Sequence, residues 1–151
     1  MMMKEIASFL EDERFAGIKF TANDFFTLER CKALYPDKLI FNGYDEMLLS
    51  GLSMGADGGI GSTYNFMADK FVLLRKLYSE GRVKEAKEIQ NEINRIIAVL
   101  CDIGVMQAEK EIMNQLGMDF GGCLPPFAEI SKENRGRIAR EIIPYITKLS
   151  V

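Results

Sequence analysis

The sequence predicts an α/β fold with about three parallel βα units followed by a helical C-terminal part. Three short apolar runs alternate with segments of helical periodicity, namely FAGIKF (15–20), KLIFNG (38–43) and ADGGIGS (56–62). Such alternation is typical of parallel strands joined by helical crossovers. The runs are apolar on both faces, as in strands covered by helices. No strand pattern returns after them, which is the third observation behind this fold class.

The first two units have clear helix signals. Residues 4–12 fit a short amphipathic helix that precedes the first strand. Asn23 is suited to cap the next helix, at about 24–34, which ends before Tyr35-Pro36-Asp37. A helix over 44–55, ending at Gly55, follows the second strand.

The rest of the chain is expected to be helical, apart from a loop rich in Gly and Pro at 119–130. Gly104 and Gly117 are suited to end helices, Ser131 to cap the last helix, and Pro144 to kink or shorten it. We therefore expect one domain over 1–151, with the βα units at 1–66 and the helical part at 67–151. The predicted helices of that part are 68–79, 83–102, about 105–116, and the helix that follows Ser131.

Composition excludes several classes of function. Apolar residues make up 48%, charged residues 27%, and the net charge is −3, so the basic excess expected of a nucleic-acid or anionic-membrane binder is absent. No apolar run is long enough for a membrane span, and a cytoplasmic protein is expected. The three cysteines lack a CxxC motif, so we expect reduced thiols and no metal site. With no histidine, Ser/His and Cys/His catalysis are excluded in this chain.

Lys19 lies at the end of the first predicted strand, where α/β folds place catalytic groups. Burial disfavours the charged form of a lysine and supplies the neutral amine that attacks a carbonyl to form a Schiff base. The alternative is a lysine that extends from the strand edge into water. Position alone favours this alternative.

Two further motifs follow the next strands. In NGYDE (42–46), Gly43 allows close approach of a ligand, and Asp45 and Glu46 lie in the first turn of a helix, where the dipole also favours carboxylates without any function. In ADGGIGSTYN (56–65), glycines thin the strand and Ser62 offers a hydroxyl. Phosphate binding is disfavoured there because the spacing and lysine of a P-loop are missing. A close contact between strand and helix is the alternative.

The order of GIKFT, NGYDE and GADGGIGSTYN resembles the N-acetylneuraminate lyase branch of the pyruvate-dependent aldolases, a family that also contains dihydrodipicolinate synthase. The resemblance covers nearly the whole chain. It implies strands six to eight of a (β/α)8 TIM barrel plus the C-terminal helical tail. Dihydrodipicolinate synthase activity is disfavoured by Asp45 and Glu46.

The resemblance implies reversible retro-aldol cleavage of N-acetylneuraminate to N-acetylmannosamine and pyruvate, without metal or diffusible cofactor. Lys19 would form the Schiff base, and Thr21 would bind the substrate beside it. The sugar hydroxyls would be held by Gly43, Asp45, Glu46 and Ser62. By the same resemblance, this sequence lacks the N-terminal segment that binds the pyruvate carboxylate and the proton-relaying tyrosine of strand five.

A sheet cut from a barrel has open edges and an uncovered apolar face. We therefore expect either a homo-oligomer or a complementary N-terminal half-barrel as partner, in addition to the small-molecule substrate. The alternative function is a catalytically incomplete half-barrel module that self-associates, since the carboxylate-binding segment and the proton relay are both outside this sequence.

Overall fold

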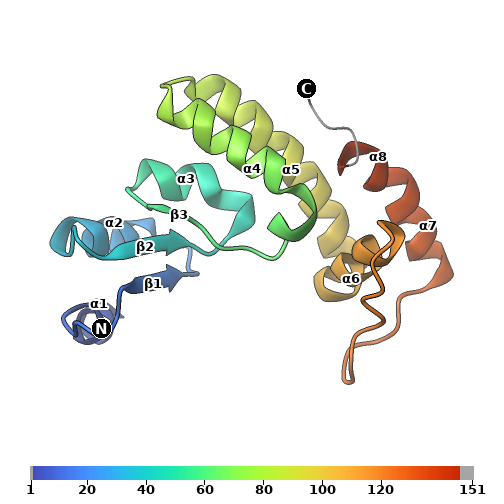
Figure 1. Ribbon diagram of the computed structural model, residues 1–151, viewed down its shortest axis with the longest axis horizontal. Helices are drawn as coiled ribbons and strands as arrows, with labels where there is room; N and C mark the ends of the chain where they lie inside the picture. The colour runs from blue at the N-terminus through green and yellow to red at the C-terminus, as the bar shows by residue number, and fades with distance from the viewer. Residues whose placement is uncertain (1, 147–151) are drawn as a thin grey trace.

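A parallel sheet and a set of helices form the two parts of the structure, a computed structural model that describes residues 2–146 (Figure 1). The three strands lie in chain order across the sheet, β1 (Gly17–Phe20), β2 (Leu39–Asn42) and β3 (Gly58–Gly59). Lys19 pairs with Phe41, and Phe41 pairs with Gly58. The predicted parallel βα alternation is confirmed.

One face of the sheet carries the smaller of two hydrophobic clusters. Ile18, Phe20 and Ile40 point to this face and pack with residues of the helices α1 (Met2–Leu10) and α2 (Phe25–Leu34). The opposite face carries Lys19, which is exposed, and Leu39, which is 44% exposed. Within the described residues this second face is therefore left open to solvent.

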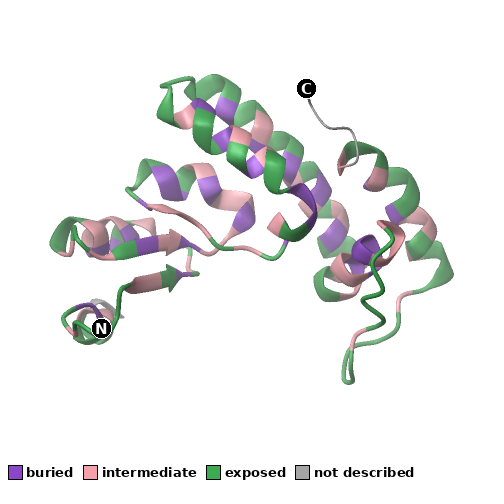
Figure 2. Ribbon diagram, in the orientation of Figure 1, coloured by how far each residue is buried: buried purple, intermediate pink, exposed green. Residues whose placement is uncertain are grey.

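The larger cluster joins the short helix α3 (Leu48–Ser53) to the helices that follow the sheet. Figure 2 shows buried residues along α3 and along the helices that follow it. The helix predicted over 83–102 is confirmed, and it buries Ala86, Ile93, Ile96 and Leu100 in this cluster, whereas Val83 at its start is 50% exposed. The C-terminal helices are α4 (Tyr64–Ser79), α5 (Val83–Ile103), α6 (Val105–Gln115), α7 (Lys132–Glu141) and α8 (Ile143–Ile146). The domain division at residue 66 stays a prediction.

Two predicted elements are shorter than expected. The third strand spans Gly58–Gly59, not 56–62, and Ile60 makes a last hydrogen bond to the Asn42 carbonyl before the chain turns away. The helix predicted over 44–55 is divided into the 3-10 helix η1 (Asp45–Met47) and α3, because the backbone of Met47 leaves the helical region. Both differences lie where the chain bends around Asp45.

Other helix ends differ by a few residues or agree. Asp24, not Asn23, caps α2, because its carboxylate accepts the Thr27 amide hydrogen at 3.0 Å. The helix α4 begins at Tyr64 rather than 68 and contains a kink at Met67. Gly104, with φ +110°, separates α5 from α6, a backbone conformation that favours glycine. The predicted cap is confirmed, since the Ser131 hydroxyl accepts from Asn134 N at 3.1 Å.

The last helix is interrupted near Pro144, as expected. The helix α7 ends at Glu141, and α8 begins at Ile143. Proline lacks the amide hydrogen that would continue the helical bonding. No disulfide joins the cysteines of the described part of the chain.

Candidate functional site

Lys19 lies in β1 with its side chain on the open face of the sheet. Its neighbours in sequence, Ile18 and Phe20, face the helices instead. Among the described residues the Lys19 side chain is exposed, not buried as the apolar run around it predicted. The physical reason is the alternation of side chains along the strand, which turns residue 19 away from the helical layer.

Gly43 brings the ends of the first two strands together. Its amide donates to the Phe20 carbonyl at 2.8 Å. A Cβ atom at Gly43 would lie 2.0 Å from Thr21 Oγ1 and 3.0 Å from Lys19 Cε. The side chains of Lys19 and Thr21 thus both approach Gly43, and a larger residue at this position would displace the Thr21 hydroxyl.

Asp45 links the end of β2 to the segment that follows β3. It is 7% exposed, and its Oδ2 accepts hydrogen bonds from Thr63 N at 2.9 Å and from Thr63 Oγ1 at 2.5 Å. A Cβ atom at Gly61 would lie 1.4 Å from Asp45 Oδ1. Gly61 is one of the glycines in the third predicted run, and the group that lies against it is a carboxylate of the protein itself.

The backbone of Asp45 and Glu46 is held by two amide side chains of α5. Gln90 Nε2 donates to Asp45 O at 3.2 Å, and Asn94 Nδ2 donates to Glu46 O at 3.1 Å. Gln90 Oε1 also accepts from Leu49 N at 3.0 Å. These bonds satisfy backbone groups at a helix start and fix the turn that carries both carboxylates.

Glu109, on α6, joins the site although sequence reasoning missed it. Ser62 Oγ donates to Glu109 Oε1 at 2.5 Å, across 47 positions of the chain. Burial raises the pKa of Glu109, the Ser62 hydrogen bond opposes this rise, and the negative charge of Asp45 raises the pKa further. No local motif surrounds Glu109, so only its contact with Ser62 identifies it.

Tyr64 places a second polar group near the same segment. Its hydroxyl is the one buried side-chain oxygen or nitrogen without a hydrogen-bond partner among the described residues. A Cβ atom at Gly59 would lie 2.2 Å from it. Burial raises the pKa of Tyr64, and the charge of Asp45 adds to the rise.

The predicted site residues therefore form two adjoining groups at the carboxyl ends of the strands. Lys19, Thr21 and Gly43 make up the first. Asp45 anchors the second, to which Ser62 belongs through its neighbour Thr63. The carboxyl ends of parallel strands are where α/β folds bind ligands. Glu46 is half-buried beside Asp45, and its side chain has no recorded partner within residues 2–146.

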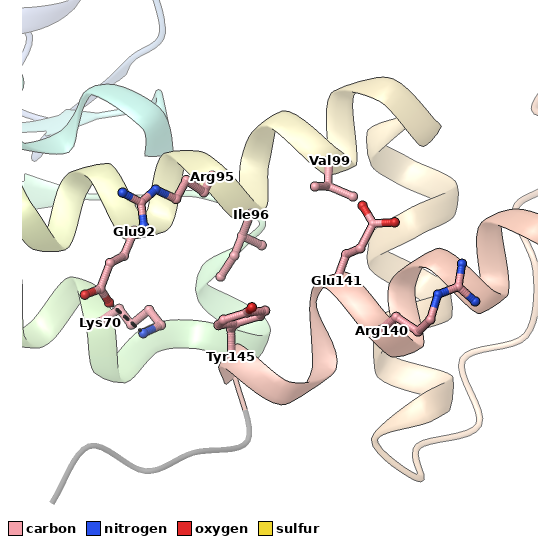
Figure 3. A pocket seen from close by; sticks show the side chains of 8 residues that line it. All are labelled: Lys70, Glu92, Arg95, Ile96, Val99, Arg140, Glu141 and Tyr145. Atoms are coloured by element: carbon pink, nitrogen blue, oxygen red, sulfur yellow. Dashed lines mark hydrogen bonds and ion pairs between the residues drawn. The ribbon is translucent and has the colours of Figure 1, made fainter.

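A cavity of about 500 Å³ lies elsewhere, among the C-terminal helices (Figure 3). Lys70 and Glu92 form an ion pair of 3.3 Å at one end, and Arg140 lies at the other end. Tyr145 lines the space between them. No predicted site residue lines this cavity, so it is a poor candidate for the site.

Neither a membrane-spanning helix nor a metal cluster was found in the part of the chain that the structure describes. No helix there is both long and apolar enough to cross a bilayer. No three His, Cys, Asp or Glu side chains gather there in a way that could hold a metal ion. The absence of a cofactor stays a prediction.

Sequence comparison finds relatives named N-acetylneuraminate lyase. The chain is 39% identical over 144 residues to an N-acetylneuraminate lyase of Rhizobium meliloti, an alignment that covers 95% of this chain and 48% of that protein. It is 40% identical over 133 residues to the N-acetylneuraminate lyase of Fusobacterium nucleatum, covering 88% and 46%. The chain thus spans about half the length of the curated relatives it matches.

Structural comparison agrees. The N-acetylneuraminate lyase of Fusobacterium nucleatum complexed with pyruvate superimposes with a TM-score of 0.89 at 38% identity, covering 98% of this chain and 50% of that one. CdNal of Clostridium difficile, in complex with mannosamine, gives a TM-score of 0.89 at 34% identity, covering 94% and 49%. The structural relatives are TIM-barrel lyases, of which this α/β chain matches about half.

The family model described as the dihydrodipicolinate synthetase family matches residues 1–143. This match covers the sheet, both groups of site residues and nearly all of the C-terminal helices. The chain belongs to the dihydrodipicolinate synthetase family.

Proposed function

We propose that this chain supplies the Schiff-base lysine and the sugar-binding side of an aldolase that cleaves N-acetylneuraminate reversibly to N-acetylmannosamine and pyruvate. The approach of the Lys19 and Thr21 side chains to Gly43, at the carboxyl ends of the first two strands, carries the proposal. Its relatives named N-acetylneuraminate lyase support the choice of substrate. The matched portion corresponds, in this proposal, to strands six to eight of the barrel and the helices after them.

The proposed chemistry begins at Lys19. Its neutral amine attacks the C2 carbonyl of the open-chain sugar acid, and loss of water leaves a protonated imine. When the C–C bond breaks, a base accepts the proton of the hydroxyl on the departing carbon, which becomes the aldehyde, and the electron pair of the broken bond turns the imine into an enamine. The terminal carbon of the enamine then takes up a proton, which gives the imine of pyruvate. Hydrolysis of the imine then releases pyruvate and restores Lys19. Neither a metal ion nor a diffusible cofactor takes part in these proposed reaction steps.

The remaining residues bind the sugar chain. Thr21 lies next to Lys19, where a hydroxyl can orient the reacting end of the substrate. Asp45, Glu46 and Ser62 present oxygen atoms along the carboxyl ends of the next strands and bind hydroxyl groups. Gly43 leaves the space for the substrate to approach. Holding the chain at several points restricts it to the reactive orientation, which lowers the entropic part of the barrier.

A half-barrel module that associates with another polypeptide is the second candidate. The observation in its favour is the open sheet face, where Leu39 is 44% and Ile60 46% exposed. In the barrels of the structural relatives, a sheet closes on itself and has no such face. The partner would be a second copy of this chain or a complementary half-barrel that also brings the carboxylate-binding segment and the proton relay.

Trapping of the imine separates the two candidates. The purified chain is incubated with pyruvate and borohydride, and the adduct is located by peptide mass spectrometry. The aldolase proposal expects the adduct on Lys19, none in Lys19→Arg, and unchanged labelling in the control Lys84→Arg, an exposed lysine of α5. Equal labelling of the wild type and Lys19→Arg contradicts the aldolase proposal. No labelling of the chain alone favours the module.

A further inference from the structure

Ser62 has a single hydroxyl proton, and the structure shows where it goes. Ser62 Oγ donates to Glu109 Oε1 at 2.5 Å, and an ionised carboxylate can only accept. The lone pairs of the Ser62 oxygen are then left for other partners. Because Ser62 is exposed, these lone pairs are accessible to a ligand.

Asp45 adds a second acceptor close to Ser62. Its Oδ2 accepts both hydrogen bonds of Thr63, the residue after Ser62. Neither Asp45 nor Glu109 has an ion pair with a lysine or arginine among the described residues. This end of the site is therefore rich in acceptors and negatively charged.

Keeping Glu109 ionised beside Asp45 costs electrostatic free energy. A hydrogen bond with only a structural role could be made without this cost. Burial and the charge of Asp45 both act against the ionised form of Glu109 and raise its pKa. A glutamine could accept the same bond from Ser62 without this penalty. The bond also ties down an exposed side chain, which contributes little to stability.

We propose that Glu109 is a positioning residue that accepts the hydrogen bond of the Ser62 hydroxyl and so leaves the Ser62 oxygen as a hydrogen-bond acceptor for the ligand. This arrangement makes the site select between two kinds of ligand group. This end of the site accepts the hydroxyl groups of a neutral polyol chain and rejects a carboxylate, which brings no donor and is repelled by Glu109 and Asp45. The inference deepens the proposed function, on which it rests, by assigning the residue that sets which chemical group binds at Ser62.

The test compares two ligands with the same six-carbon chain, mannitol and mannonate, which differ by one terminal carboxylate. Their affinities for the full chain are measured from amide chemical shifts of Ser62 and Thr63. Glu109→Ala removes the acceptor, Glu109→Gln keeps it, and Glu88→Gln on α5 is a control at an exposed glutamate. Dispersed amide spectra verify that each variant is folded.

We expect Glu109→Ala to bind mannitol about tenfold more weakly while mannonate binding is unchanged or stronger, since one charged hydrogen bond and one repulsion are lost. Glu109→Gln should recover mannitol binding, and Glu88→Gln should equal the wild type. Equal weakening of both ligands in Glu109→Ala, or no mannitol binding by the wild type up to its solubility limit, overturns the inference. Borohydride trapping at Lys19 in the same samples reports separately on the proposed function.

Discussion

Gln90 Nε2 donates a hydrogen bond of 3.2 Å to the carbonyl oxygen of Asp45, 45 positions earlier in the chain. Gln90 is 7% exposed, and its Oε1 accepts from Leu49 N in the same turn. A helix that lies outside the sheet thus holds the carboxylate-bearing turn at the end of β2. The position of Asp45 depends on contacts with α5 that are distant in sequence.

Replacing Gln90 with Leu should lower the free energy of unfolding by about 1–3 kcal/mol, because two buried backbone groups lose their partners. Asn91→Ala, at an exposed position of the same helix, is the control and should change it by less than about 0.5 kcal/mol. Urea denaturation measures both. Similar values for the two variants would show that the Gln90 bonds do not stabilise the turn.

Gly61→Ala should be destabilising by about 1–3 kcal/mol, because its Cβ would lie 1.4 Å from Asp45 Oδ1 and the carboxylate would have to move. Gly122→Ala is the matched control, since a Cβ there meets no atom within 4 Å. Thermal unfolding of both variants tests the difference. A Gly61→Ala protein as stable as Gly122→Ala contradicts the close approach.

Gly43→Ala should leave the fold intact but impair the chemistry at Lys19. The new methyl group would lie 2.0 Å from Thr21 Oγ1, so the Thr21 side chain must rotate away and Lys19 Cε must shift. Displacements of this kind can cost about 100-fold in rate. If the aldolase proposal holds, the rate of imine trapping should fall by about that order, with an unchanged circular dichroism spectrum. Trapping at the wild-type rate argues against a site built on this contact.

Because of Asp57, the free energy of unfolding should depend on pH in the acidic range. Its partial burial raises its pKa, but the hydrogen bond from Ile40 N and the ion pair with Lys32 at 2.9 Å outweigh this effect, and the net pKa lies below its usual value of 3.8. Because folding lowers the pKa of Asp57, the stabilisation that its carboxylate gives the folded protein is fully present above about pH 3.8. It is lost as the pH falls through the folded-state pKa.

The variant Asp57→Asn should therefore be less stable than the wild type at pH 7, by about 1–2 kcal/mol. The difference should shrink as pH falls below the usual aspartate value. Chemical denaturation at a series of pH values measures it, with Asp119→Asn, in the exposed loop after α6, as the control. A gap between Asp57→Asn and the wild type that stays constant down to the acid limit would exclude this linkage.

The open face of the sheet should promote self-association. Analytical ultracentrifugation of the chain alone is expected to show an oligomer that Leu39→Asp weakens about tenfold or more, because a charge would be buried in the contact. Val72→Asp places the same charge on α4, at a residue that is 68% exposed. A monomeric wild type, or equal effects of both substitutions, contradicts this prediction.

The parallel βα alternation and the helical C-terminal part could be predicted from the sequence because both depend on local patterns. Apolar runs, glycines at helix ends and Ser131 act within a few residues of the chain. The contact of Lys19, Thr21 and Gly43 was also within reach, since it lies on two neighbouring strands. The extent of β3 and the bend at Met47 were not, because they depend on Asp45, Thr63 and Gln90 meeting in space.

The order of strands and helices follows from residue type and short spacing, and the six candidate site residues follow from the motifs that carry the family resemblance. Three other features became visible in the folded chain: Lys19 faces the open side of the sheet, Gln90 holds the Asp45 turn, and Glu109 accepts a hydrogen bond from Ser62. The physical reason is that exposure and hydrogen bonding depend on which surfaces pack together. Packing brings together residues separated by more than 40 positions, and no local pattern records it.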